Sequence, residues 1–326
     1  SERLPHAGPA LMPDFLVAIV GPDFYQFLLI GLVTGLLYAL IALGYTMVYG
    51  IINLINFAHG DLFMLGTFLA LSLAGWVGVE TATGKGSGAI AGTVLIMLVV
   101  TPLACAALNI ATDKAIYKPL RSSPKLTVIV SAIGVSFIFM NLGLFWKGAT
   151  PVRFPDLIPD DNLLASVGLT FTWKDAMVVG ITIPAMIALT LFVKFTPLGK
   201  AMRATAQNPT AAQLMGINVD RVIAATFGIG GALAGVGSVV YGLYIKSVDY
   251  QIGFQNGLYA FTAAVLGGIG NIPGAVLGGL VIGVVGELSK AYLGAKWSEA
   301  TIFAILIIIL MFRPAGLLGA RVREKV

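Results

Sequence analysis

The chain has 326 residues, of which 58% are hydrophobic and only 11% carry a charge. An average soluble domain is about 25% charged, so this composition excludes a water-soluble fold, which would need far more polar surface. The formal net charge is +5, but the basic residues lie in short stretches between apolar runs, which argues against a nucleic-acid-binding role. The sequence therefore predicts an integral membrane protein.

The N-terminal stretch, residues 1–23, holds four prolines and two aspartates. It is neither a clean signal peptide nor a span, and we interpret it as an extracytoplasmic segment. A transmembrane domain is expected over 24–319, and a cytoplasmic tail over 320–326.

Nine apolar segments follow one another within the transmembrane domain. They are 24–49, 57–77, 88–111, 126–146, 175–194, 221–245, 257–270, 274–293 and 298–312. Most reach the roughly 20 residues that a helix needs to cross the hydrocarbon core, although 257–270 and 298–312 are short. The predicted fold is all-α, a polytopic membrane protein with about nine transmembrane helices and a range of eight to ten.

The distribution of Lys and Arg predicts the orientation of these helices. The loops 112–125 and 194–221 and the C-terminal tail are rich in basic residues and should be cytoplasmic. An odd number of crossings must then separate the outer loop 246–256 from the tail. Nine crossings with the N-terminus outside satisfy this condition, whereas a re-entrant hairpin at 257–270 does not.

Glycines recur at a four-residue spacing in three of the apolar segments. The pairs are Gly31 and Gly35, Gly231 and Gly235, Gly274 and Gly278, and Gly279 and Gly283. This spacing lets two helix backbones approach closely, so we predict that these positions pack helices together rather than take part in chemistry.

Polar residues interrupt the apolar sequence between Tyr49 and Gly66. They are Asn53, Asn56, His59 and Asp61. Polar groups at membrane depth are expensive and usually face a cavity or a partner, which favours a translocation pathway or gate. Alternatively, Asn53 or Asn56 caps a helix that starts near Phe57, and His59 and Asp61 lie at the cytoplasmic interface. The residues alone leave both interpretations open.

The cytoplasmic loop from Pro197 to Val222 is longer than a simple connector, and such loops tend to be functional. Thr210 is a candidate N-cap for a short helix through Met215 that ends at Gly216. A short helix on the cytoplasmic surface can be moved by a soluble partner that docks on it. The alternative is a solvated basic loop that only sets topology.

No set of residues predicts catalysis, a cofactor or a metal. The single Cys105 excludes an internal disulfide, and the two histidines have no ligand-like spacing. The nearest approach to a P-loop, at Gly84 to Gly86, lacks its first glycine and its final Ser or Thr. Glu287 and Lys290 stand three residues apart on one predicted helix and are expected to pair.

The connection 147–175, predicted to lie outside, is long, contains prolines and mixes acidic with basic residues. These properties suit a reversible docking surface for an external protein. We expect the acidic residues Asp156, Asp160 and Asp161 to take part in it.

Three long motifs resemble one family. They are the run GLLYALIALGYTMVYGIINLINFAHGDLFMLGTF, the loop GKAMRATAQNPTAAQLMGINVDRVIAATFGIGGALAG and the run AFTAAVLGGIGNIPGAVLGG. They are similar to branched-chain amino acid ABC transporter permeases of the LivH type, and the resemblance extends from residue 24 to 319. It implies a type II-like importer permease in a bacterial inner membrane, without a cofactor.

The resemblance also implies partners. These are a homologous second permease, two cytoplasmic ATPase subunits that hydrolyse ATP, and an extracytoplasmic solute-binding protein. The cytoplasmic loop resembles the segment that docks on an ATPase, although Thr replaces the Glu of the usual E-A-A-x-x-x-G motif. The residues assigned to this contact are Thr210, Ala211, Ala212, Gly216 and Asn218.

Two further functions stay open at this stage. Related permeases carry other amino acids, amides or urea. A secondary transporter would need an ion-coupling site near the midplane, and no acidic residue stands convincingly at the centre of a predicted span.

Overall fold

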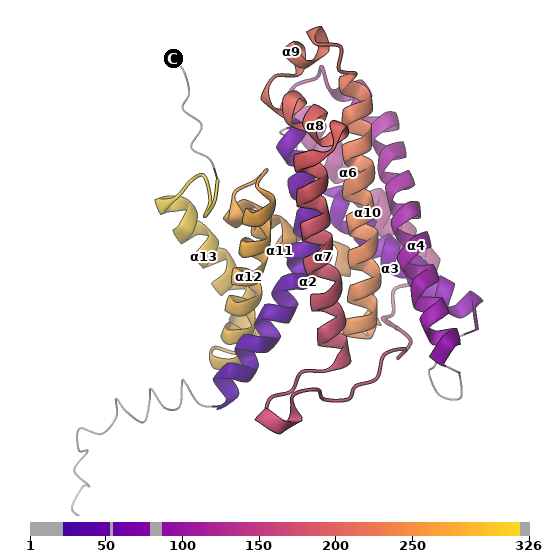
Figure 1. Ribbon diagram of the computed structural model, residues 1–326, viewed down its shortest axis with the longest axis vertical. Coiled ribbons are helices and arrows are strands. Elements are labelled where there is room, and N and C mark those ends of the chain that lie inside the picture. Colours follow the sequence, from indigo (N-terminus) through magenta and orange to yellow (C-terminus); the bar gives the residue numbers. More distant parts are fainter. Residues whose placement is uncertain (1–21, 53–54, 79–86, 320–326) are drawn as a thin grey trace, which may run out of the picture.

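The computed structural model describes residues 22–52, 55–78 and 87–319, and these are mostly helical (Figure 1). Helices are expected because a backbone that spans lipid must satisfy its own hydrogen bonds. The long helices are α2 (Pro22–Ile52), α3 (Ala58–Trp76), α4 (Ser87–Thr112), α6 (Lys125–Lys147), α7 (Trp173–Phe195), α10 (Val219–Ile245), α11 (Ile252–Gly267), α12 (Ile272–Tyr292) and α13 (Ser298–Phe312). Residues 1–21 of the segment expected at 1–23 and the whole tail expected at 320–326 lie outside the described residues, whereas Pro22 and Asp23 begin α2.

Short elements connect the long helices. A π-helix, η1 (Asp113–Tyr117), and α5 (Lys118–Leu120) extend α4, and α8 (Pro197–Gln207) and α9 (Pro209–Leu214) lie between α7 and α10. The remaining short elements are the 3-10 helices η2 (Ala165–Val167) and η3 (Ala295–Trp297), and the strands β1 (Val152–Arg153) and β2 (Ser247–Val248), which pair antiparallel.

Each of the nine predicted apolar segments contains a helix. Among the described residues, eight helices are long and apolar enough to cross a membrane. The ninth, α11, has 16 residues and spans about 24 Å at 1.5 Å per residue, less than the ~30 Å hydrocarbon core. Its N-terminal turn starts inside the bundle, because Gly253 and Gly257 face the backbone of Gly60 on α3.

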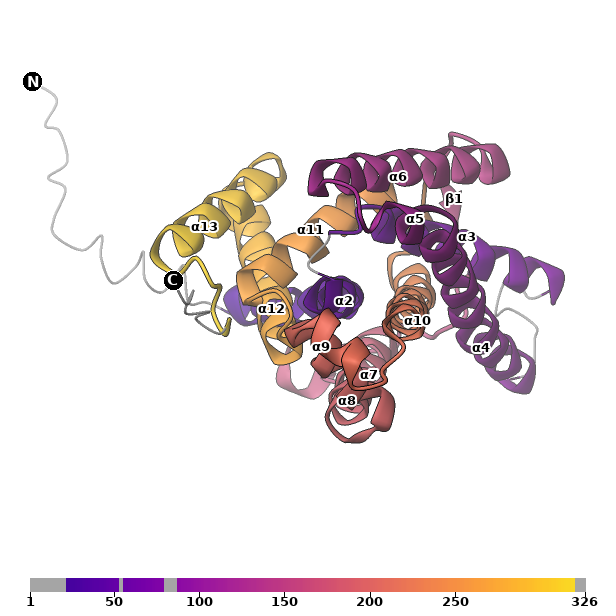
Figure 2. The ribbon, with the colours of Figure 1, turned by 90° about the horizontal axis from the view of Figure 1, so that it is seen from above.

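Seen from above, α2 and α10 stand in the middle of the bundle (Figure 2). α2 crosses α12 at the position of the predicted glycine pairs. A Cβ atom at Gly35 would lie 2.8 Å from the carbonyl oxygen of Gly279, and one at Gly31 would lie 2.7 Å from the Cα of Val284. Real Cβ atoms do not approach backbone so closely, so this crossing requires glycine.

The other glycine pairs lie at two further crossings. On α10, Gly231 and Gly235 face the backbone of α4 at Cys105 and Pro102, where a Cβ would lie 2.6 Å or less from a neighbouring atom. On α12, Gly278 faces Ala263 of α11. These contacts join α10 to α4 and α12 to both α2 and α11, and Gly44 of α2, which faces Gly230 of α10, connects the two groups. The predicted pair of Glu287 and Lys290 is confirmed by a 2.7 Å ion pair on α12.

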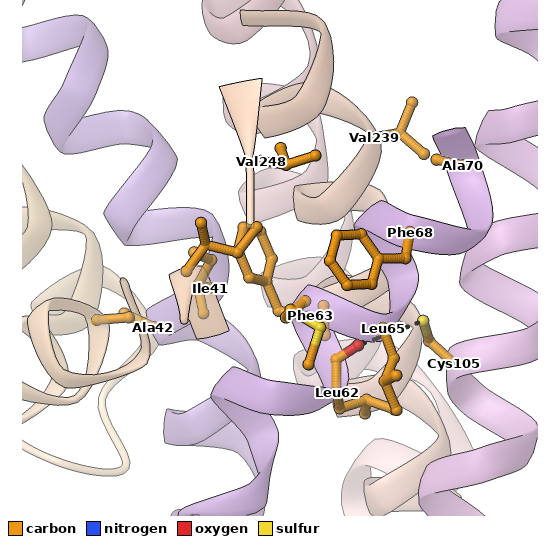
Figure 3. Close-up of a cluster of buried hydrophobic side chains, with 14 of the residues drawn as sticks. Ile41, Ala42, Leu62, Phe63, Leu65, Phe68, Ala70, Cys105, Val239 and Val248 are labelled. Atoms are coloured by element: carbon orange, nitrogen blue, oxygen red, sulfur yellow. Dashed lines mark hydrogen bonds between the residues drawn. The ribbon is translucent and has the colours of Figure 1, made fainter. Parts of the chain in front are cut away.

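The largest apolar cluster surrounds α3. Phe63 and Phe68 are fully buried beside Ile41 of α2 and Val239 of α10 (Figure 3). Polar side chains inside this cluster bond to helix backbone: the Ser238 hydroxyl, for example, donates to the carbonyl oxygen of Phe63 over 2.6 Å. This packing buries most of the residues of α3.

The connection between α6 and α7 lies at the opposite end of the bundle from α8 and α9 (Figure 1). Four charged side chains hold it there. Lys174 binds Asp156 at 2.7 Å and Asp160 at 2.6 Å, and Lys246 binds the same two carboxylates at 3.0 and 2.6 Å. We call these four residues the outer clamp.

Two of the three aspartates expected to serve docking, Asp156 and Asp160, are therefore used in internal pairs. Asp161 is exposed and makes no ion pair with any described residue.

The outer clamp has a predictable pH dependence. Partial burial opposes ionisation of Asp156, but hydrogen bonds from Lys174 and Lys246 outweigh it and hold the pKa of this carboxyl below its usual value. The same two lysines lower the pKa of Asp160. A carboxyl with a lowered folded-state pKa stabilises the fold above its ordinary pKa and loses that contribution as the pH falls through the lowered value. The clamp therefore stabilises the fold at neutral pH and loses this contribution only in acid.

We expect Lys174→Met to loosen the connection 148–172. Lys174 is 4% exposed, and its removal leaves two adjacent carboxylates to share Lys246, so their repulsion favours an open loop. Limited proteolysis at pH 7 should cut this connection several-fold faster than in the parent protein. Lys296→Met, at an exposed lysine at the same end of the bundle, is the control. Equal cutting rates in the two variants would show that the clamp does not hold the connection.

Candidate functional site

The polar residues at the start of α3 lie inside the bundle. Asn56 is 5% exposed, and His59 and Asp61 are each 1% exposed. Gly44 on α2 makes room for His59, because a Cβ at that position would collide with the imidazole ring. The ring also contacts Tyr45 edge-on, with 4.7 Å between ring centroids.

Asp61 lies at the depth of the middle of α6. The hydroxyl of Ser136, at the midpoint of the 23-residue α6, donates to Oδ2 of Asp61. The other oxygen, Oδ1, is buried without a hydrogen-bond partner among the described residues. The burial of both side chains favours the pathway interpretation over the alternative that places His59 and Asp61 at the cytoplasmic interface. The reason is that α3 begins within the bundle, so its first turn is already surrounded by neighbouring helices.

The side chain of Asn56 bonds to α4 and to its extension η1 instead of capping α3. The N-cap of α3 is Phe57, and no side chain caps this helix. Asn56 Oδ1 accepts a 2.7 Å hydrogen bond from Tyr117 Oη, and its Nδ2 donates to Asn109 Oδ1 over 3.5 Å. Asn109 in turn donates to the carbonyl oxygen of Phe227 at 2.6 Å. The capping interpretation is thus wrong for Asn56, and Asn53 lies outside the described residues.

Sequence reasoning missed Asn109, Tyr117 and Ser136 as members of this site. A lone Asn at the end of the apolar segment 88–111 was a usable signal, because an amide in lipid needs a partner. Tyr117 gave no signal, since it was assigned to a cytoplasmic loop. Ser136 gave none either, because an isolated Ser in a span usually bonds to its own helix.

An apolar cavity of about 370 Å³ lies further along α3, beginning one helical turn beyond Asp61. It is lined by Leu65, Gly66, Leu69, Ala104, Cys105, Leu108, Leu142 and Trp146. The helices α3, α4 and α6 therefore place a buried carboxylate and an aliphatic surface along the same side of α3.

The cytoplasmic loop of the sequence analysis contains the two helices α8 and α9, which we call the helix pair. It lies at one end of the bundle (Figure 1). Asn208, not Thr210, caps α9, because its side chain accepts from the backbone N–H of Ala211 at 3.0 Å. Thr210 lies in the first turn, where it is exposed. Asn208 takes the capping position instead of Thr210 because it directly precedes Pro209. The φ of a proline is fixed at a value that suits the first helical position.

The tip of the helix pair presents large apolar side chains. Leu214 is 85% exposed and Met215 is 83% exposed, whereas Ala212 is buried. Gly216 has a φ of +83°, so the chain turns there in a conformation that favours glycine. Asn218 then caps α10 through the N–H of Arg221 at 3.0 Å. An exposed apolar tip on a fixed turn is typical of a surface that is covered by a partner.

Comparison with known proteins decides the family. Residues 27–310 match the family described as the permease component of the branched-chain amino acid transport system. The chain belongs to this family. It is 39% identical to the high-affinity branched-chain amino acid transport system permease protein LivH of Salmonella typhimurium, over 93% of this chain and 98% of that protein. It is 37% identical to the corresponding BraD protein of Pseudomonas aeruginosa, over 94% of this chain and all of that protein.

Membership confirms the resemblance drawn from the sequence and the all-α polytopic fold. The family consists of membrane permease subunits of transport systems rather than catalytic enzymes. The protein is therefore a multi-pass membrane permease component that works within a transport complex.

Proposed function

We propose that this chain forms the translocation pathway for branched-chain or related amino acids in an ATP-driven importer of a bacterial inner membrane. The observation that supports this best is the similarity to LivH of Escherichia coli, at 39% identity over 93% of this chain and 98% of that protein. The transmembrane unit is assigned to 24–319 and the cytoplasmic tail to 320–326.

The family resemblance implies the partners, and the two ends of the bundle offer surfaces for them. The helix pair is the docking surface for a cytoplasmic ATPase. Its exposed residues there are Ala211, Leu214, Met215 and Gly216, whereas Ala212 is buried beneath them. A homologous second permease completes the pathway, and an external binding protein delivers the substrate at the end that carries the outer clamp. ATP is hydrolysed by two partner ATPase subunits.

Asn56, His59 and Asp61 form the polar part of the pathway or its inner gate. A carboxylate such as that of Asp61 can pair with the ammonium group of an amino acid. The apolar cavity between α3, α4 and α6 has room for an aliphatic side chain. Together these features suit an amino acid with a branched hydrocarbon side chain better than an amide or urea.

The buried carboxylate also supports one alternative. An ionisable group at membrane depth is a feature of ion-coupled transporters, and Asp61 is one. A secondary transporter is thus the second candidate, and the source of energy separates the two.

A substrate panel tests the proposed specificity. The complex that copurifies with this chain is reconstituted in proteoliposomes with its binding protein and internal ATP. We expect leucine, isoleucine and valine to compete with labelled leucine, while alanine, glutamine and urea do not. Stronger competition by alanine, glutamine or urea would assign the chain to a different substrate within the family.

Gly216 offers a test of the docking surface. Its φ is +83°, and a Cβ added there would have no neighbouring atom within 4 Å. A β-branched residue at this position therefore suffers from backbone strain and not from collision, at a cost of roughly 1–2 kcal/mol. We expect Gly216→Val to insert normally but to lose most ATP-driven uptake, because the tip of the helix pair is displaced. Gly216→Asn is the matched control, since Asn tolerates positive φ. Full uptake in Gly216→Val would argue against this docking surface.

A further inference from the structure

The first turn of α10 is tied to the cytoplasmic end of α4. Asp220 Oδ1 lies 2.6 Å from Nη1 of Arg121, and its Oδ2 lies 2.8 Å from Nζ of Lys118. Because α10 follows the helix pair after a short turn capped by Asn218, a displacement of the helix pair moves Asp220. Arg121 and Lys118, which both bind Asp220, are therefore the residues next to α4 that respond first to such a displacement.

Arg121 also holds a buried carboxylate. Its Nη2 lies 2.6 and 2.9 Å from the two oxygens of Asp113, a residue with 1% of its side chain exposed. Separating a buried pair leaves an uncompensated charge and is strongly unfavourable. Asp113 must therefore follow Arg121 when the cytoplasmic end of α10 moves.

Asp113 is the first residue of the π-helix η1, and Tyr117 is the last. In a regular α-helix, side chains eight residues apart, such as those of Asn109 and Tyr117, would point about 80° away from each other. In the wider π-turn, each residue turns the chain through a smaller angle than in an α-helix. The angle between the side chains of Asn109 and Tyr117 is therefore smaller than about 80°. Both side chains consequently reach Asn56, and Tyr117 also stacks on Phe227 with 5.4 Å between ring centroids.

Asn56 connects this series of contacts to the pathway. Its side chain accepts from Tyr117 at 2.7 Å, and its carbonyl oxygen accepts from the backbone N–H of His59 at 3.1 Å. A shift of Tyr117 thus acts on the first turn of α3, where His59 and Asp61 lie.

We propose that Arg121 and Tyr117 are positioning residues that couple the helix pair to the start of α3. The proposal rests on the proposed function of these two regions. In this arrangement, an ATPase that moves the helix pair shifts Asp220, Arg121, Asp113 and η1 in turn, and Tyr117 then moves Asn56. The π-turn is the element that changes its rotation, because it interrupts the regular hydrogen bonding of the α-helix.

The test measures uptake and ATP hydrolysis together in the reconstituted complex. Tyr117→Phe removes one hydroxyl and keeps the ring stacked on Phe227. We expect the number of leucine molecules taken up per ATP to fall about fivefold, as expected for the loss of one buried hydrogen bond, with ATP hydrolysis within about twofold of the parent. Tyr244→Phe is the matched control, since it removes a tyrosine hydroxyl that bonds to Asp175 at the other end of the bundle.

A second variant and a double variant make the outcome decisive. If Tyr117→Phe fails to assemble, Asp220→Asn is used instead, since Asp220 is 53% exposed, and the same fall in leucine per ATP is expected. Tyr117→Phe combined with Asn56→Ala should be no worse than the worse single variant, because both act through one contact. An unchanged ratio in the single variants, or effects that multiply in the double variant, would overturn the inference. Failure of the parent complex to take up any branched-chain amino acid would instead refute the proposed function.

Discussion

Asp61→Asn is expected to reduce ATP-driven uptake about tenfold or more, which corresponds to ~1.4 kcal/mol in a rate. The substitution keeps the size of the side chain and its ability to accept from Ser136, but it removes the charge that we assign to the pathway. The protein should be as stable as the parent or more stable, because an ionised carboxylate buried with a single hydrogen bond is unfavourable for folding. Uptake and the thermal unfolding midpoint are measured on the same preparation.

This combination separates a role in transport from a role in folding. A residue that only holds the bundle together would lower both uptake and stability when it is changed. Asp113→Asn should differ from Asp61→Asn in stability. Because Asp113 is paired with Arg121, its replacement should lower the unfolding midpoint as well as the uptake. Normal uptake in Asp61→Asn would remove Asp61 from the pathway.

Gly283→Val is expected to abolish most of the folded protein. A Cβ at this position would collide with the carbonyl oxygen of Gly31 and with the backbone of Gly35. Backbone cannot rotate away as a side chain can, so the crossing of α2 and α12 must open. Overpacking typically costs about 1–3 kcal/mol and occasionally more, against a total stability of only about 5–15 kcal/mol. The fraction of monodisperse protein after detergent extraction measures the effect.

Gly180→Val on α7 is the matched control for this substitution. Gly180 is exposed, and a Cβ there would have no neighbour within 4 Å. The extracted protein should remain monodisperse, with an unfolding midpoint close to that of the parent. Similar losses in both variants would mean that valine itself, and not the crossing of α2 and α12, causes the defect.

The helices and their packing positions could be predicted from the sequence, because both depend on local patterns. Long apolar runs identify the spanning helices, and the four-residue spacing of Gly31 and Gly35 identifies a face that another backbone can approach. The partner of that face, Gly279 and Gly283 on α12, could not be assigned, since the spacing alone does not say which helices meet.

The candidate site was predicted only in part. The four polar residues between Tyr49 and Gly66 stood out from their apolar surroundings, but their depth did not follow from the sequence. Depth depends on where α3 begins relative to its neighbours, and the contact between Asp61 and Ser136 joins residues 75 positions apart. The pairing of Asp156 and Asp160 with Lys174 and Lys246 was missed for the same reason: charges in one loop appear free until the fold brings their partners together.

The central claim is that this chain is part of an ATP-driven permease, and measuring which energy source drives uptake tests it most directly. Labelled leucine uptake is measured in proteoliposomes that hold either the full complex or this chain alone, with internal ATP, with a proton gradient, or with neither. We predict accumulation only for the full complex with ATP, and no ATP hydrolysis by the chain alone. Accumulation by the chain alone, or accumulation driven by a proton gradient without ATP, would contradict the assignment as an ATP-driven permease and favour a secondary transporter.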